Sequence, residues 1–142
     1  MRLRATPQSR RATSGSKWSS LMLPKRLRIS KGATDNLKML KGRTGLTPNL
    51  ICRMALLLSL EDGPKGGLRN VEDLGSEFNS PTLFGEFAFL FESLIRQVHG
   101  ELDTRQCAAV IVSHIDDGLE RLRKSRSLSD LVQHSGLLSS VE

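Results

Sequence analysis

The sequence predicts a mainly α-helical protein in which a short strand or extended arm and two helices are followed by two longer C-terminal helices. Apolar residues alternate along one short segment near the N-terminus and then recur at helical spacing through most of the chain. Threonine-proline and serine-proline pairs precede two of the apolar runs, where they are typical of helix starts. At 142 residues, the chain fits one domain with a modest core and a tail.

The strand or arm is expected between Leu23 and Ser30. Leu27 and Ile29 fall on one face of an extended segment, whereas Arg26 and Arg28 fall on the other. Successive side chains of a strand point to opposite faces, so one face is largely apolar and the other is cationic.

A first helix is expected to begin after Ser30 and to end near Gly42. Its apolar residues recur about one turn apart: Ala33, Leu37 and Leu40. Gly42 and Gly45 bracket the tight connection to the next helix. Because glycine permits a positive φ or a close approach of backbones, these two residues mark either a turn or an interface between subunits.

A second helix is expected to begin at Pro48 with Thr47 as its N-cap. Almost every residue from 50 to 60 is apolar, so we expect this helix to be buried on most of its circumference. A strand and two helices cannot enclose it. Either the C-terminal half of the chain or a second copy must therefore cover it.

The order of strand, helix and helix over residues 23–62 resembles ribbon-helix-helix DNA-binding proteins, in which two chains pair their strands into a ribbon that enters the major groove. More specifically, LPKRLRISK, KGRTGLTPNLICR and LSLEDG resemble the DndE family of DNA sulfur-modification proteins, and the likeness extends through EFNSPTLFGE. That family's systems replace a non-bridging phosphate oxygen of DNA with sulfur. The resemblance implies a small DNA-binding accessory subunit, with double-stranded or nicked DNA and other subunits as its partners.

Positive charge is concentrated in the N-terminal part of the chain. Residues 1–53 carry thirteen Lys or Arg and one acidic residue, whereas residues 54–142 carry eight and fourteen. This asymmetry favours a surface that meets a polyanion, and a merely solvated basic face is the alternative. The residues expected to contact DNA phosphates are Lys25, Arg26, Arg28, Lys31, Lys38, Lys41 and Arg43. If the strand enters the major groove, Arg26 and Arg28 are best placed to reach guanine edges.

Three parts of the chain are distinguished by composition. Residues 1–21 are rich in Arg and Ser and contain no acid, so we expect a disordered basic extension. Residues 22–126 form the helical DNA-binding domain, and residues 127–142 form a flexible tail with one helical turn near Asp130. No apolar run reaches the ~18 residues that span a bilayer, so we expect a cytoplasmic protein with no membrane partner.

The C-terminal half is expected to contain a loop and two helices. Residues 61–79 are glycine-rich and predict a long loop with one helical turn around Val71 to Leu74. A helix then opens at Ser80-Pro81 and runs to Gly100. Asp103 and Gln106 form a capping-box pattern at the start of the last helix. Its basic run, residues 121–126, either contacts phosphate or stabilises the helix C-terminus.

The sequence favours no cofactor, metal site or catalytic residue. The three histidines lack the paired spacings of zinc sites. Cys52 and Cys107 fall within expected helices and are interpreted as reduced core thiols, although a persulfide carrier is the alternative that sulfur chemistry suggests.

Two other functions remain open. A nickase would need clustered carboxylates; acidic pairs occur, but the helical Asp116 and Asp117 should diverge by about 100° and thus not share a site. A ribbon-helix-helix repressor would instead prefer one palindromic sequence. In each case we expect a homo-oligomer.

Overall fold

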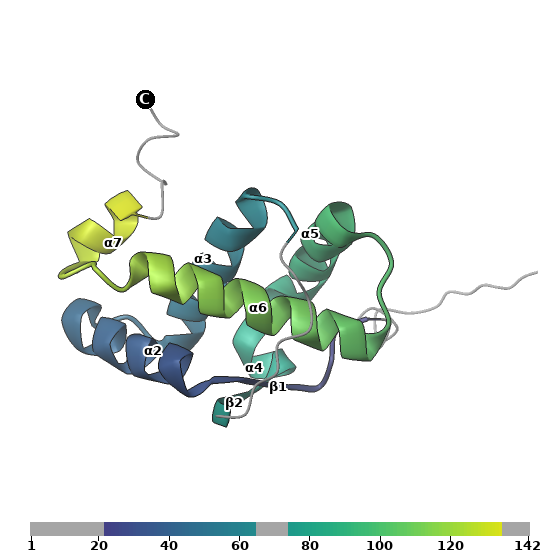
Figure 1. Cartoon of the computed structure of the whole chain (residues 1–142), viewed down its shortest axis with the longest axis horizontal. Helices are drawn as coiled ribbons and strands as arrows, with labels where there is room; N and C mark the ends of the chain where they lie inside the picture. The colour runs from purple at the N-terminus through teal and green to yellow at the C-terminus, as the bar shows by residue number, and fades with distance from the viewer. Residues whose placement is uncertain (1–21, 65–73, 135–142) are drawn as a thin grey trace, which may run out of the picture.

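The computed structural model describes residues 22–64 and 74–134. The elements in chain order are β1 (Arg26–Ser30), α2 (Lys31–Thr44), α3 (Pro48–Glu61), β2 (Leu74–Asn79), α4 (Ser80–Phe84), the 3-10 turn η2 (Gly85–Phe87), α5 (Ala88–His99), α6 (Thr104–Leu122) and α7 (Leu128–His134). α6 runs across the middle of the molecule, with α3 behind it and the two strands below (Figure 1). The predicted mainly helical class is confirmed.

The strand β1 shows the predicted alternation. Leu27 and Ile29 are buried in the core, whereas Arg26 and Arg28 are exposed. β1 pairs in antiparallel fashion with β2 of the same chain, with Leu27 opposite Phe78. In the ribbon-helix-helix class the strand partner comes from a second chain, so the pairing described here is of a different kind.

The strand β2 lies in the segment that was expected to be a loop. The prediction of a loop is therefore wrong for residues 74–79, and Leu74 begins a strand instead of ending a helical turn; residues 71–73 of that turn lie outside the described residues. Gly75 permits the strand to approach α2, because a Cβ at this position would overlap the Thr34 hydroxyl. The Ser76 backbone N–H donates to that hydroxyl at 2.8 Å.

The helix α2 ends at Thr44, two residues beyond Gly42, near which its end was expected. A glycine inside a helix costs stability but does not end it, whereas Gly45 has φ 78° and forms the left-handed cap. The Gly45 N–H donates to the Lys41 carbonyl at 2.9 Å. The left-handed residue therefore sets the helix end.

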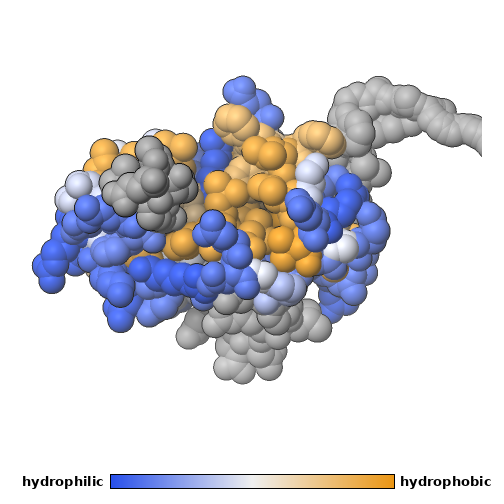
Figure 2. Space-filling view, turned by 90° about the horizontal axis from the view of Figure 1, so that it is seen from above, coloured by the Kyte–Doolittle hydropathy of each residue, from blue (hydrophilic) through white to orange (hydrophobic). Residues whose placement is uncertain are grey.

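The helix α3 begins as predicted, with the Thr47 hydroxyl accepting from the Leu50 N–H and Pro48 in the first turn. Its inner side packs against α6, where Gly118 lies directly on the Ala55 backbone. Its outer side is uncovered: Leu50 and Leu57 are 42% and 43% exposed. The expectation of burial on most of the circumference is therefore confirmed within a single chain, except for this narrow exposed stripe. Figure 2 shows apolar side chains gathered over α3 and α5.

The helix expected from Ser80 to Gly100 is divided into α4, η2 and α5. Gly85 has φ 56°, which interrupts the helix. The Ser80 hydroxyl donates to the Pro24 carbonyl and its N–H to the Lys25 carbonyl, so Ser80 ties α4 to the chain before β1 and does not act as an N-cap. Gly100, with φ 80°, ends α5 as predicted.

The helix α6 carries the predicted capping box of Asp103 and Gln106 and buries one side in the core. α7 follows it and buries Leu131. This helix lies within the segment that was expected to be a flexible tail and begins two residues before the helical turn foreseen near Asp130.

Candidate nucleic-acid interface

The cationic face of β1 is arranged around one carboxylate of β2. Glu77 lies opposite Arg28 in the strand register and accepts from its Nη2 at 3.0 Å. Arg26 approaches the other carboxylate oxygen at 3.7 Å. A second nitrogen of Arg28 donates to the Gly75 carbonyl at 3.1 Å. β2 therefore holds both guanidinium groups in place.

Glu77 lowers the charge of this face without abolishing it. Two arginines share one carboxylate, so one positive charge remains uncompensated. The Arg26 side chain is 72% exposed and that of Glu77 is 37% exposed, and ion pairs of this kind contribute little to stability because water screens them. An anion from solution can therefore compete for either guanidinium. Sequence reasoning missed Glu77 because its segment carried no clear strand pattern.

Four lysines extend the positive surface beyond the strand. Lys25 precedes β1, and Lys31, Lys38 and Lys41 lie along α2. All four are exposed, and none forms an ion pair with another described residue. Lys31 and Lys38 are seven residues apart and thus share one face of the helix. These side chains are available for a polyanion.

Arg43 has a different environment from the other predicted contacts. Its Nη1 donates to the backbone carbonyls of Arg123 at 3.2 Å and Ser125 at 3.3 Å, just beyond α6. The residue remains exposed, but part of its hydrogen-bonding capacity is used inside the chain. Its position is therefore fixed by the end of α6.

Gly42 and Gly45 face open space. A Cβ built at either position would meet nothing within 4 Å among the described residues. Packing within one chain therefore does not require glycine at either position, although the positive φ of Gly45 favours it there. Their role in an interface between subunits stays a prediction.

A comparison with known protein families shows to which family this chain belongs. The family described as "DNA sulphur modification protein DndE" matches residues 26–130, which is most of the chain. The chain belongs to the DndE family. Membership of this family gives the chain a role in DNA phosphorothioation.

Two solved DndE structures resemble this DndE-family chain. The crystal structure of DndE from Escherichia coli B7A, involved in DNA phosphorothioation modification, is 28% identical, with a TM-score of 0.61 over 70% of this chain and 97% of that chain. A double glycine-to-lysine mutant of DndE is 24% identical, with a TM-score of 0.60 over the same shares of the two chains, and supports the fold alone. No curated protein matches the chain.

The two thiols of this DndE-family chain are poorly suited to sulfur transfer. Cys52 and Cys107 are both fully buried. Burial raises the pKa of Cys52 to about 12, with a smaller contribution from the Asp116 carboxylate. Burial likewise raises the pKa of Cys107 to about 12, and Glu92 adds to the effect. Since the thiolate is the reactive form, this environment favours the core interpretation over a persulfide carrier.

A buried polar chain links α3, α5 and α6. His99 Nε2 lies 2.8 Å from His114 Nε2, and His114 Nδ1 lies 2.7 Å from the Ser59 hydroxyl. That hydroxyl donates to Asp117 at 2.8 Å, so it must accept from His114. An activated serine nucleophile would instead donate its proton to the histidine. The network therefore lacks the direction of a catalytic triad.

The adjacent Asp116 and Asp117 of α6 are expected from helical geometry to face different sites. Both residues contribute atoms to the lining of one hollow of about 580 Å³ beside α2. However, one Asp117 oxygen is engaged by Ser59 and by Arg121, the latter at 3.1 Å. Within residues 22–64 and 74–134, no group of three or more His, Cys, Asp or Glu side chains is arranged to hold a metal ion.

Over the same two ranges, no helix has both the length and the apolar character needed to cross a membrane.

Proposed function

We propose that this DndE-family chain is a DNA-binding accessory subunit of a phosphorothioation system and that it holds duplex or nicked DNA mainly through backbone phosphates. The observation that carries this proposal is the set of exposed lysines that form no ion pair with any described residue, beside the two outward arginines of β1. Phosphate contacts of this kind position a protein on DNA without reading its sequence. Arg26 and Arg28 can add base contacts if the strand enters a groove.

We also propose that the chain works in the cytoplasm as a homo-oligomer beside other subunits of the system. Support comes from the uncovered apolar residues of α3 and from the open space at Gly42 and Gly45. Small proteins commonly cover such surfaces by closed symmetric association. A second copy is the occupant that we propose.

The test is binding of the full chain to intact and singly nicked duplexes of unrelated sequence across a salt series. Lys38→Gln should weaken binding to every duplex and reduce the slope of log K against log salt by about one. Arg105→Gln is a matched control, because it also removes one exposed charge from a helix but lies outside the proposed interface. An equal effect of both variants would contradict specific contact along α2.

The same samples distinguish the two other functions. Magnesium is included, and the DNA is run on a denaturing gel after binding. New strand breaks that disappear on Asp116→Asn would identify a nickase. Strong preference for one palindromic duplex would identify a repressor. Sequence-tolerant, salt-sensitive binding without breaks is the result that we expect.

A further inference from the structure

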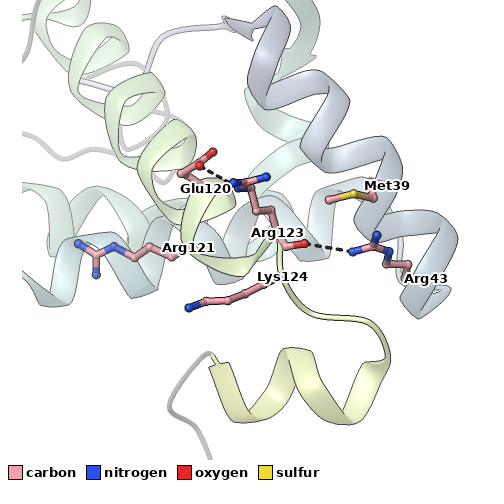
Figure 3. A pocket seen from close by; sticks show the side chains of 6 residues that line it. All are labelled: Met39, Arg43, Glu120, Arg121, Arg123 and Lys124. Atoms are coloured by element: carbon pink, nitrogen blue, oxygen red, sulfur yellow. Dashed lines mark hydrogen bonds and ion pairs between the residues drawn. The ribbon is translucent and has the colours of Figure 1, made fainter.

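A second concentration of positive charge lies where the C-terminal ends of α2 and α6 meet. A hollow of about 480 Å³ is lined there by Met39, Arg43, Glu120, Arg121, Arg123 and Lys124. Figure 3 shows these side chains: Arg43 and Met39 come from α2, Glu120 and Arg121 from the end of α6, and Arg123 and Lys124 from the residues that follow it. The sequence predicts one of two roles for the basic run, residues 121–126: it stabilises the C-terminus of the helix or it contacts phosphate.

The capping role belongs to Arg43. Its guanidinium donates to the carbonyl of Arg123, just beyond the last turn of α6 (Figure 3). It also donates to the carbonyl of Ser125. Carbonyls at this end of a helix need such donors, and a cation there also complements the helix dipole. Arg43 of α2 supplies a cation and a donor to the C-cap carbonyl of Arg123, and the Leu122 carbonyl accepts from the Ser125 N–H, so neither carbonyl depends on a side chain of the basic run.

The side chains of the basic run divide into two groups. Arg121 points away from the hollow's other cations and pairs with Asp62 and Asp117. Arg123 pairs with Glu120 at 2.8 Å, and the two side chains are 58% and 62% exposed. Lys124 is exposed and forms no ion pair within the described part of the chain. Because Asp62 and Asp117 neutralise Arg121, the hollow presents three cations and one carboxylate. The cations are Arg43, Arg123 and Lys124, and the carboxylate is that of Glu120.

We propose that this hollow is an anion site that takes a phosphate of the DNA backbone, at a position separate from β1. The inference rests on the proposed function. Arg123 supplies a planar fork that matches phosphate, and Lys124 supplies a point charge. The exposed pair with Glu120 is a weak competitor, since such pairs contribute little in water. Met39 gives the hollow an apolar wall beside the charged groups.

The hollow lies where one DNA duplex could contact it and the lysines of α2 at the same time. α2 has 14 residues and is therefore about 20 Å long, which corresponds to about six base pairs of duplex. Lys41 and Arg43 lie in its last turn, beside the hollow, and β1 leads into its first turn. A duplex lying along α2 would thus meet β1 near one end and the hollow near the other.

Three variants of the full chain test this site in the salt series. Arg123→Gln should lower the affinity for a 20-base-pair duplex and reduce the salt slope by about one. Glu120→Gln should act in the opposite direction, because it removes the competing carboxylate while an amide can keep contact with Asn36. Arg105→Gln is the control: it lies in the first turn of α6, about 27 Å from the end of that helix, and should leave the affinity closer to that of the unaltered chain.

The outcomes separate this inference from the proposed function. If the unaltered chain binds DNA and Lys38→Gln weakens it, while Arg123→Gln behaves like Arg105→Gln, the hollow is not a DNA contact and only this inference fails. If inorganic phosphate binds at the hollow, with loss in Arg123→Gln, but no duplex binds, DNA is the wrong occupant. A weaker Arg123→Gln together with a tighter Glu120→Gln supports the site when both changes exceed that of Arg105→Gln, since a change of net charge alone would act as strongly at Arg105.

Discussion

At the scale of single residues, the two buried thiols give the plainest chemical prediction. With pKa values of about 12, Cys52 and Cys107 are protonated at neutral pH and enclosed by the core. We therefore expect a disulfide reagent to label neither thiol of the folded protein at pH 8 and to label both in concentrated urea. Rapid labelling of one thiol in the folded state would restore the persulfide carrier as a serious interpretation.

The lowered pKa of His99 predicts how the stability of the folded chain depends on pH. Burial lowers its pKa from the ordinary value of 6.5, so the folded state binds the proton less readily than the unfolded state does. The contribution of His99 is therefore fully present above pH 6.5 and is lost as the pH falls through 6.5 toward the lowered value. Urea unfolding between pH 8 and pH 5 should show a smaller loss of stability for His99→Gln than for the unaltered chain. An equal loss in both would contradict this prediction.

At the scale of the elements, the crossing of α3 and α6 depends on Gly118. A Cβ there would overlap the carbonyl of Ala55, and a helix backbone cannot move aside cheaply. Gly118→Ala should therefore cost about 1–3 kcal/mol of unfolding free energy, measured in urea. Gly32→Ala is the control, because a Cβ at Gly32 meets nothing within 4 Å. If the two variants were equally stable, the helices would be less tightly packed than described.

Local sequence signals were sufficient to predict those helices and strands whose ends are set by their own residues. The alternation of β1, the Thr47-Pro48 start of α3 and the capping box of α6 were all predicted correctly. Elements that depend on distant partners were not. β2 is held by β1 and by Thr34, both far away in the sequence, and the break at Gly85 follows from its backbone conformation. The presence of a glycine in the sequence does not reveal whether its backbone will continue a helix or interrupt it.

At the scale of the whole molecule, the sequence located the basic surface but not the groups that modify it. The exposure of the cations on β1 and α2 followed from periodicity. Glu77, which shares the two arginines of β1, and the carbonyls that hold Arg43 come from segments more than 45 residues away. Such partners become visible only when the chain is folded, so charge pattern alone overestimates how many cations are unengaged.

Assembly of several chains can be tested at Gly42. Gly42 lies in a regular helical turn with open space around it, so Gly42→Leu should not disturb the single chain and should even favour the helix. If a second copy packs closely here, the larger side chain will shift the mass measured by light scattering toward smaller species. Gly32→Leu is the matched control, since it adds the same side chain to the other end of α2 in equally open space. An unchanged mass for Gly42→Leu would exclude this glycine from the interface and leave the uncovered face of α3 as the remaining surface for association.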